Sequence, residues 1–206
     1  MPGVAGVLLS LLAAAAAAVV ERPTLHLALD VEPGVVIEQR SLRRVAAEVE
    51  RLWADVVPVR VTLPGAPEPA VADRRVVVHV TRRLLWTHEQ SGLGWIFFDA
   101  GVPRDELTVS VEAVTRLLEG GHWEGRPLSA LPPAVSERFV ERALARAIAH
   151  EVGHYLLAST DHDARGLMRA TFSADEILDE RPALVRLSPA AERRLRSRTG
   201  LVARRD

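Results

Sequence analysis

The stretch HEVGHYLLASTDHDARGLMRA, residues His150–Ala170, is the most informative part of the chain. It opens with two histidines, His150 and His154, inside the longest segment with helical apolar periodicity. Residues four apart lie on one face of an α-helix, so both imidazoles can reach one ion. Glu151 follows the first histidine, where its carboxylate can reach a metal-bound water without binding the metal. The pattern predicts a zinc site on a long helix.

A third protein ligand is needed, because a catalytic zinc ion takes three such ligands and keeps one position open for water. His162, eight residues after the second histidine, is the nearest candidate and the one we favour. Asp161 and Asp163 flank it and could bind instead, or could orient a ligand from outside the metal shell. Glu176 and Glu180, on a further predicted helix, are the remaining options.

The order of these residues resembles the metzincin clan of zinc metallopeptidases, in which H-E-x-x-H is followed by a third histidine and a tight turn carrying methionine. In that clan the methionine lies beneath the metal as an apolar floor, and Met168 holds the matching place. The clan spacing, H-E-x-x-H-x-x-G-x-x-H, is not kept. Leu157 replaces the glycine and His162 comes two residues later, so the turn after the helix must be longer. Tyr155, the only tyrosine, is expected to pack within the helix.

The resemblance implies a zinc metalloendopeptidase that cleaves a peptide or protein substrate. One catalytic Zn²⁺ would be held by His150, His154 and His162, with Glu151 as the general base. Gly153 lies between the first two ligands, where the close approach of another backbone segment would explain a glycine.

An edge strand above the cleft pairs with the extended substrate in metzincins, and Gly92–Asp99 is the candidate for that strand here. The same segment could equally be an ordinary core strand. Gly94, Trp95 and Ile96 are therefore expected to contact substrate. Arg169, just after the methionine, is a further candidate for substrate binding.

Two other functions are compatible with the motif. A zinc-binding scaffold of the same fold, without catalysis, would need the histidines but would have no use for Glu151. A metal-free helical domain with a coincidental motif would bind no stoichiometric zinc. Metal analysis and peptide cleavage separate the three.

The periodicity outside the motif predicts a single α+β domain. We expect a mixed, twisted sheet of about four or five strands, a backing helix, the long active-site helix and a C-terminal helix, in a zincin-like architecture. The predicted strands are Leu25–Val31, Val59–Leu63, Arg75–Thr81, Gly92–Asp99 and Glu106–Val111. The predicted helices span 38–55, 112–118, 133–157, the segment SADEILDE from Ser173, and 188–198, and residues 120–133 are expected to form a loop.

Composition narrows the function further. The chain has 206 residues, of which 48% are hydrophobic and 26% charged, with a net charge of −1. These values are typical of a globular protein and give no field that would attract nucleic acid. Cysteine is absent, so disulfides are excluded and a metal site must use His, Asp or Glu. We expect a monomer.

An apolar, alanine-rich run spans residues 4–20. It predicts a cleavable signal over residues 1–19 and one catalytic domain over 20–206, exported to the periplasm or the extracellular space. An uncleaved signal would leave the protein anchored in the membrane. The third possibility is an internal helix of a cytosolic protein.

Overall fold

The structure is a computed structural model that describes residues 24–67, 74–84, 86–87, 90–179, 181 and 185–198. The predicted signal over residues 1–19 lies outside these ranges, as does Glu180. None of the helices in the described part of the chain is long and apolar enough to cross a membrane.

A five-stranded sheet, in the order β2-β1-β3-β7-β6, forms one side of the fold. Four of the strands are parallel to their neighbours, and β6 runs antiparallel to β7 at one edge. This confirms the predicted mixed sheet. The strands are β1 (Leu25–Val31), β2 (Val59–Thr62), β3 (Arg74–Thr81), β6 (Gly94–Asp99) and β7 (Val102–Ser110).

Only one face of the sheet is fully buried. Leu25, Leu27 and Leu29 of β1 are buried, whereas His26 and Asp30 between and beside them are partly or fully exposed. β3 alternates in the same way from Val76 to Val80, and β7 does so only from Glu106 to Val109. Since successive side chains of a strand point to opposite faces, this pattern requires a helical layer on one face alone.

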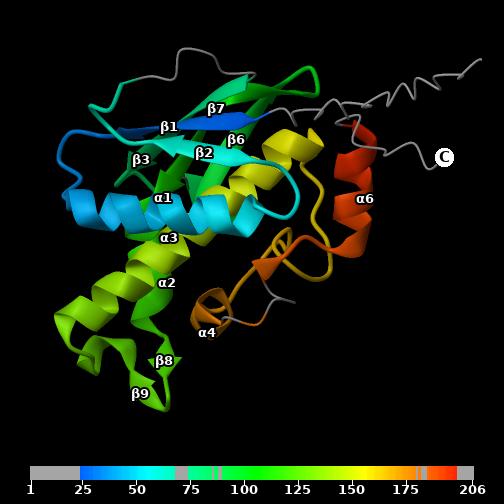
Figure 1. Ribbon diagram of the computed structural model, residues 1–206. Coiled ribbons are helices and arrows are strands. Elements are labelled where there is room, and N and C mark those ends of the chain that lie inside the picture. Colours follow the sequence, from blue (N-terminus) through cyan, green and yellow to red (C-terminus); the bar gives the residue numbers. More distant parts are fainter. Residues whose placement is uncertain are drawn as a thin grey trace, which may run out of the picture.

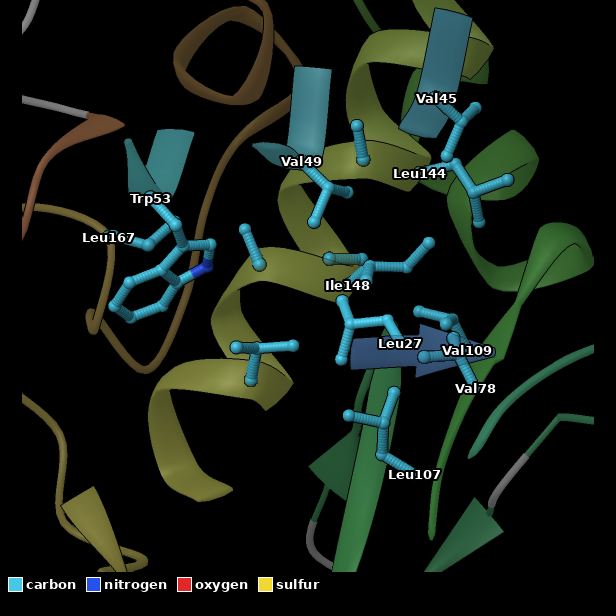
Figure 2. Close-up of a cluster of buried hydrophobic side chains, with 14 of the residues drawn as sticks. Leu27, Val45, Val49, Trp53, Val78, Leu107, Val109, Leu144, Ile148 and Leu167 are labelled. Atoms are coloured by element: carbon cyan, nitrogen blue, oxygen red, sulfur yellow. The ribbon is translucent and has the colours of Figure 1, made fainter. Parts of the chain in front are cut away.

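Two helices, α1 (Gln39–Trp53) and α3 (Pro133–Leu157), cover the buried face side by side (Figure 1). Figure 2 shows side chains of both helices and of the strands in one cluster. Its labelled members include Val45 and Val49 of α1, Leu144 and Ile148 of α3, and Leu27, Val78 and Val109 of the strands. The other α-helices of the described residues are α2 (Val111–Glu119), α4 (Ala174–Leu178) and α6 (Pro189–Arg198).

The second half of α3 is buried on nearly all sides, from Ala143 to Leu157. A surface helix buries only one apolar stripe, whereas this half is buried nearly all round; Val135, near the start of α3, is exposed. The helix is central because α1, the sheet, α4 and α6 all pack around it. The metal-binding motif therefore stands on a rigid, internal element.

The short elements were not predicted. Residues 120–133 were expected to form a loop but contain a two-stranded hairpin and one 3-10 turn. Strands of two residues carry no periodic signal, so the sequence did not predict them. These elements are β8 (His122–Trp123), β9 (Arg126–Pro127) and η1 (Leu128–Ala130), and a second small hairpin joins β4 (Trp86–Thr87) to β5 (Gln90–Ser91). The strand β7 also begins earlier than expected, at Val102, because it pairs with β6 as a hairpin.

The helix α3 begins and ends by different means. Pro133 occupies its first turn, where a missing N–H group costs nothing. At the other end Ala158 takes the left-handed conformation, with φ 44° and ψ 50°. The N–H of Ser159 donates to the carbonyl of His154 at 3.3 Å, which closes the turn. The chain thus reverses one residue after Leu157, without a glycine.

Candidate metal site

His150 and His154 are oriented by carbonyl groups of the loop that follows α3. The Nδ1 atom of His150 lies 2.7 Å from the carbonyl oxygen of Leu167, and that of His154 lies 2.7 Å from the carbonyl of Ser159. A carbonyl only accepts, so both Nδ1 atoms carry the proton. Both Nε2 atoms are therefore left unprotonated, and they lie 3.0 Å apart. This is the form in which imidazole binds a metal.

His162 completes a group of three. One ligand atom from each of His150, His154 and His162 lies within 4.8 Å of the others. Among the residues that the structure describes, this is the group of His, Asp and Glu side chains close enough to share an ion. Three imidazoles are a donor set that suits one zinc ion with a position left for water.

Asp163 holds the loop that carries His162. Its N–H donates to the carbonyl of Met168 at 2.7 Å, and its carboxylate accepts from Ser188 and Arg194 at the start and along the length of α6. Ser188 also caps α6 by accepting from the N–H of Ala191. The C-terminal helix thus fixes the third histidine through Asp163.

The alternative ligands are placed elsewhere. Glu176 binds the guanidinium of Arg169 through both carboxylate oxygens, at 2.8 and 2.7 Å, and forms a capping box with Ser173. The carboxylate of Asp163 is turned to α6, and Asp161 is not in the group of side chains close enough to share an ion. The structure therefore brings His162, and none of these three acids, to the histidine pair.

Burial keeps the two helical histidines neutral. Burial, followed by the proximity of His154, lowers the pKa of His150 to about 4. Burial likewise lowers the pKa of His154. Both imidazoles are uncharged at neutral pH, which leaves their Nε2 lone pairs available.

Glu151 is a buried carboxyl beside the histidines. It is 6% exposed, and burial raises its pKa to about 8. Within the described chain its carboxylate has no hydrogen-bond partner. A Cβ atom on Gly94 would lie 2.9 Å from Cγ of Glu151, so the glycine lets the backbone of β6 pass directly over this side chain. A carboxyl that is buried, unpaired and next to three imidazoles is a candidate proton acceptor.

Gly153 leaves room for a sulfur atom. A Cβ atom at this position would lie 2.2 Å from Sδ of Met168, which is fully buried. The predicted close approach at Gly153 is thus made by a side chain and not by another backbone. Met168 packs against α3 between the two helical histidines.

A cleft runs between the edge strand and the histidines. It brings together the four residues predicted to bind substrate, Gly94, Trp95, Ile96 and Arg169. Tyr155 does not line it, and its hydroxyl donates to Asp105 at 2.7 Å, in keeping with a packing role. The other lining residues are Gly92, Leu93, Phe98, His150, Glu151, His154, Thr160, His162, Ala170, Thr171 and Phe172.

Sequence reasoning missed two residues at this site. Phe172 lies edge-on to the ring of His150, with centroids 6.3 Å apart, and no sequence signal marks it. Arg146 lines a small pocket next to His150. It precedes His150 by four residues and so shares its face of the helix, but the sequence does not show that it is buried.

The chain shares its fold with two solved archaeal proteins. Archaemetzincin from Methanopyrus kandleri matches with a TM-score of 0.50 and 16% identity, over 87% of this chain and 96% of that one. A zinc-dependent peptidase from Methanocorpusculum labreanum matches with a TM-score of 0.54 and 14% identity, over 83% and 99%. Neither a protein-family model nor a curated protein sequence matches the chain.

Proposed function

We propose that the protein is a zinc-dependent peptidase. The observation that carries this is the joint placement of three imidazoles and one buried, unpaired carboxyl, Glu151, in a cleft beneath an edge strand. A purely structural metal site has no use for that carboxyl. The fold of an archaemetzincin and of a zinc-dependent peptidase supports the same reading.

His150, His154 and His162 would hold the ion. When bound, zinc supplies Lewis-acid chemistry, which makes water a stronger acid and the substrate carbonyl a better electrophile. Two of the three histidines are already fixed in the ligand tautomer by carbonyl groups, so little rearrangement is needed on binding.

Glu151 would act as general base and then as general acid. It accepts a proton from the attacking water as the water oxygen bonds to the carbonyl carbon. It then donates that proton to the amine nitrogen as the C–N bond breaks. Burial raises the pKa of Glu151 to about 8 in the metal-free chain, and a positive charge at the histidines would lower it and favour the ionised base at neutral pH.

The edge strand β6 would bind the substrate backbone. It pairs with β7 on one side only, and its residues Gly94, Trp95 and Ile96 line the cleft. An extended peptide can add to such an edge by main-chain hydrogen bonds. Arg169 would form a wall of the cleft, because its guanidinium already donates to Glu176 and to the carbonyl of Thr171.

Met168 would serve as the apolar floor of the site, as the methionine does in metzincins. Its packing against Gly153 and its complete burial support this role. The export of the chain through residues 1–19 is part of the same proposal, and N-terminal sequencing of protein from separated cell fractions tests it.

The function is tested by removing and restoring the metal. Purified protein should contain about one zinc per chain and cut an unbiased peptide mixture. A chelator should abolish cleavage, and one equivalent of zinc should restore it. Stoichiometric zinc with no cleavage of any peptide would instead establish a non-catalytic zinc scaffold, and the absence of zinc would exclude both functions.

A further inference from the structure

The third histidine of the proposed metal site lacks the support that the other two have. The Nδ1 atoms of His150 and His154 each donate to a backbone carbonyl at 2.7 Å. The ring of His162 lies 5.3 and 4.8 Å from those two rings, measured between centroids. Within the described chain it makes no hydrogen bond, and it is exposed. A metal ligand is normally oriented by a hydrogen bond from outside the metal shell, so the position of His162 must be set through its backbone.

Asp163, the next residue, ties that backbone to the C-terminal part of the chain. Its carboxylate accepts from Ser188 and, at 3.1 Å, from Arg194, and its side chain is only 14% exposed. A hydrogen bond between a carboxylate and a guanidinium is stronger than one between neutral groups. Ser188 and Arg194 belong to the start and the middle of α6, which lies beside the end of α3 (Figure 1).

The same part of the chain supports the first histidine. The carbonyl of Leu167 accepts from His150, and the N–H of Leu167 donates to the carbonyl of Arg186 at 2.8 Å. Two successive hydrogen bonds thus connect Arg186 to His150. Residues 186–194, which we call the C-terminal segment, therefore support two of the three histidines from outside the metal shell.

Gly166 brings the two backbones into direct contact. Its φ is 78°, and a Cβ atom there would lie 2.4 Å from the carbonyl oxygen of Arg186. Both the conformation and the lack of space exclude a side chain at this position. The loop that carries His162 and the C-terminal segment therefore pack against each other closely, and neither can shift far without moving the other.

We propose that Asp163 is a positioning residue, through which the C-terminal segment sets the affinity of the site for zinc. The docked segment favours the arrangement in which the three imidazoles lie together, and zinc binds that same arrangement. Docking of the segment and binding of the ion are then coupled, and the coupling is reciprocal. The inference rests on the proposed metal site but not on its peptidase chemistry.

The test measures the zinc affinity of full-length variants by competition with a colorimetric chelator. Asp163→Ala should weaken binding by about 10–100-fold, the loss typical of residues that orient a ligand from outside the metal shell. Arg194→Gln removes one partner of Asp163 and should weaken binding by about 3-fold. Arg196→Gln is the matched control, because it makes the same change on the same helix but Arg196 binds Glu192 of α6 itself, and it should leave affinity unchanged.

A spectroscopic readout separates positioning from general stabilisation. The visible absorption of bound cobalt(II) depends on the number and geometry of its ligands. We expect the spectrum of cobalt-loaded Asp163→Ala to shift from that of wild type toward that of His162→Ala, while Arg196→Gln keeps the wild-type spectrum. A residue that only stabilised the fold would lower the free energy of unfolding in urea and leave the spectrum of the folded protein unchanged.

The coupling has two further signatures. Adding Arg194→Gln to Asp163→Ala should cause almost no further loss of zinc affinity, because both substitutions break the same contact. Zinc should also slow the exchange of amide hydrogens in α6 in the wild type, and much less so in Asp163→Ala.

Three outcomes would overturn the inference. One is a zinc affinity of folded Asp163→Ala within about 2-fold of wild type, and another is an equal loss in Arg194→Gln and Arg196→Gln. The last two variants decide the matter alone if Asp163→Ala does not fold, since their side chains are 44% and 41% exposed. The third is wild-type protein that binds no zinc, which would remove the metal site as well. Stoichiometric zinc without peptide cleavage, together with the expected affinities, would remove only the peptidase function and leave the role of Asp163 standing.

Discussion

Gly153 and Met168 fit against each other with no space for a further carbon atom: a Cβ on the glycine would lie 2.2 Å from the methionine sulfur. The glycine stands between the two helical histidines, and the methionine comes from the loop that returns beneath the helix. This contact packs the loop that follows α3 against α3 itself, directly beneath the two histidines. This contact explains a glycine in the middle of a buried helix.

Gly153→Ala should therefore destabilise the protein. Alanine is the better helix former by about 1 kcal/mol, but the clash forces Met168 out of place, at a cost of about 1–3 kcal/mol. We expect a net loss of stability in urea unfolding, together with weaker zinc binding. Gly120→Ala is the control, since a Cβ there would meet nothing within 4 Å. Equal stability of Gly153→Ala and wild type would contradict the observed packing.

Ala158→Gly should have the opposite effect. Ala158 takes a left-handed conformation that disfavours any side chain, and glycine removes that strain. We expect a gain of about 0.5–1 kcal/mol in the free energy of unfolding. Ala134→Gly, in the first turn of α3, should lower stability. If both substitutions lowered it alike, α3 would not end as described.

His162→Ala should weaken zinc binding by more than about 100-fold, beyond the loss typical of a residue outside the metal shell. The reason is that His162 contributes one of the three nitrogen atoms that lie within 4.8 Å of one another. Asp161→Asn is the control, because Asp161 does not belong to this group of ligand atoms, and it should leave affinity nearly unchanged. Competition titrations with a colorimetric chelator measure both. The reverse ranking would make Asp161 the ligand.

Glu151 should make the stability of the metal-free protein depend on pH. Burial raises its pKa from 4.5 to about 8, so the folded chain holds a proton there that the unfolded chain has lost. Stability is then highest below pH 4.5 and falls as pH rises to 8. Glu151→Gln has no such proton. We expect it to be more stable than wild type by on the order of 3 kcal/mol at pH 8 and nearly equal at pH 5. A difference independent of pH would contradict the burial of a protonated Glu151.

The sequence predicted the regular elements well because their periodicity is strong. The strand Leu25–Val31 and the helix Pro133–Leu157 have the predicted bounds. The histidine pair was also predictable, since a spacing of four on a helix leaves little freedom. The position of His162 was harder to predict, because it depends on the left-handed turn at Ala158, which no glycine marks.

The roles of the remaining site residues could not be predicted from the sequence, because they depend on tertiary contacts. The pairing of Gly153 with Met168 joins residues whose proximity depends on the whole course of the loop. Arg146 has the residue type of a solvated helix face, and only the packing around α3 shows that it is buried. Charged residues inside a pocket cannot be told from surface ones by sequence pattern alone.

The most direct test of the account is the cleavage of an unbiased peptide mixture by wild-type and Glu151→Gln proteins at equal zinc content. We expect about one zinc per chain in both proteins. We also expect cleavage by the wild type and a loss of at least about 1,000-fold in the variant, since a general base contributes about 10²–10⁴-fold and the same group also returns the proton to the amine. Cleavage by Glu151→Gln at a rate close to that of wild type would contradict it.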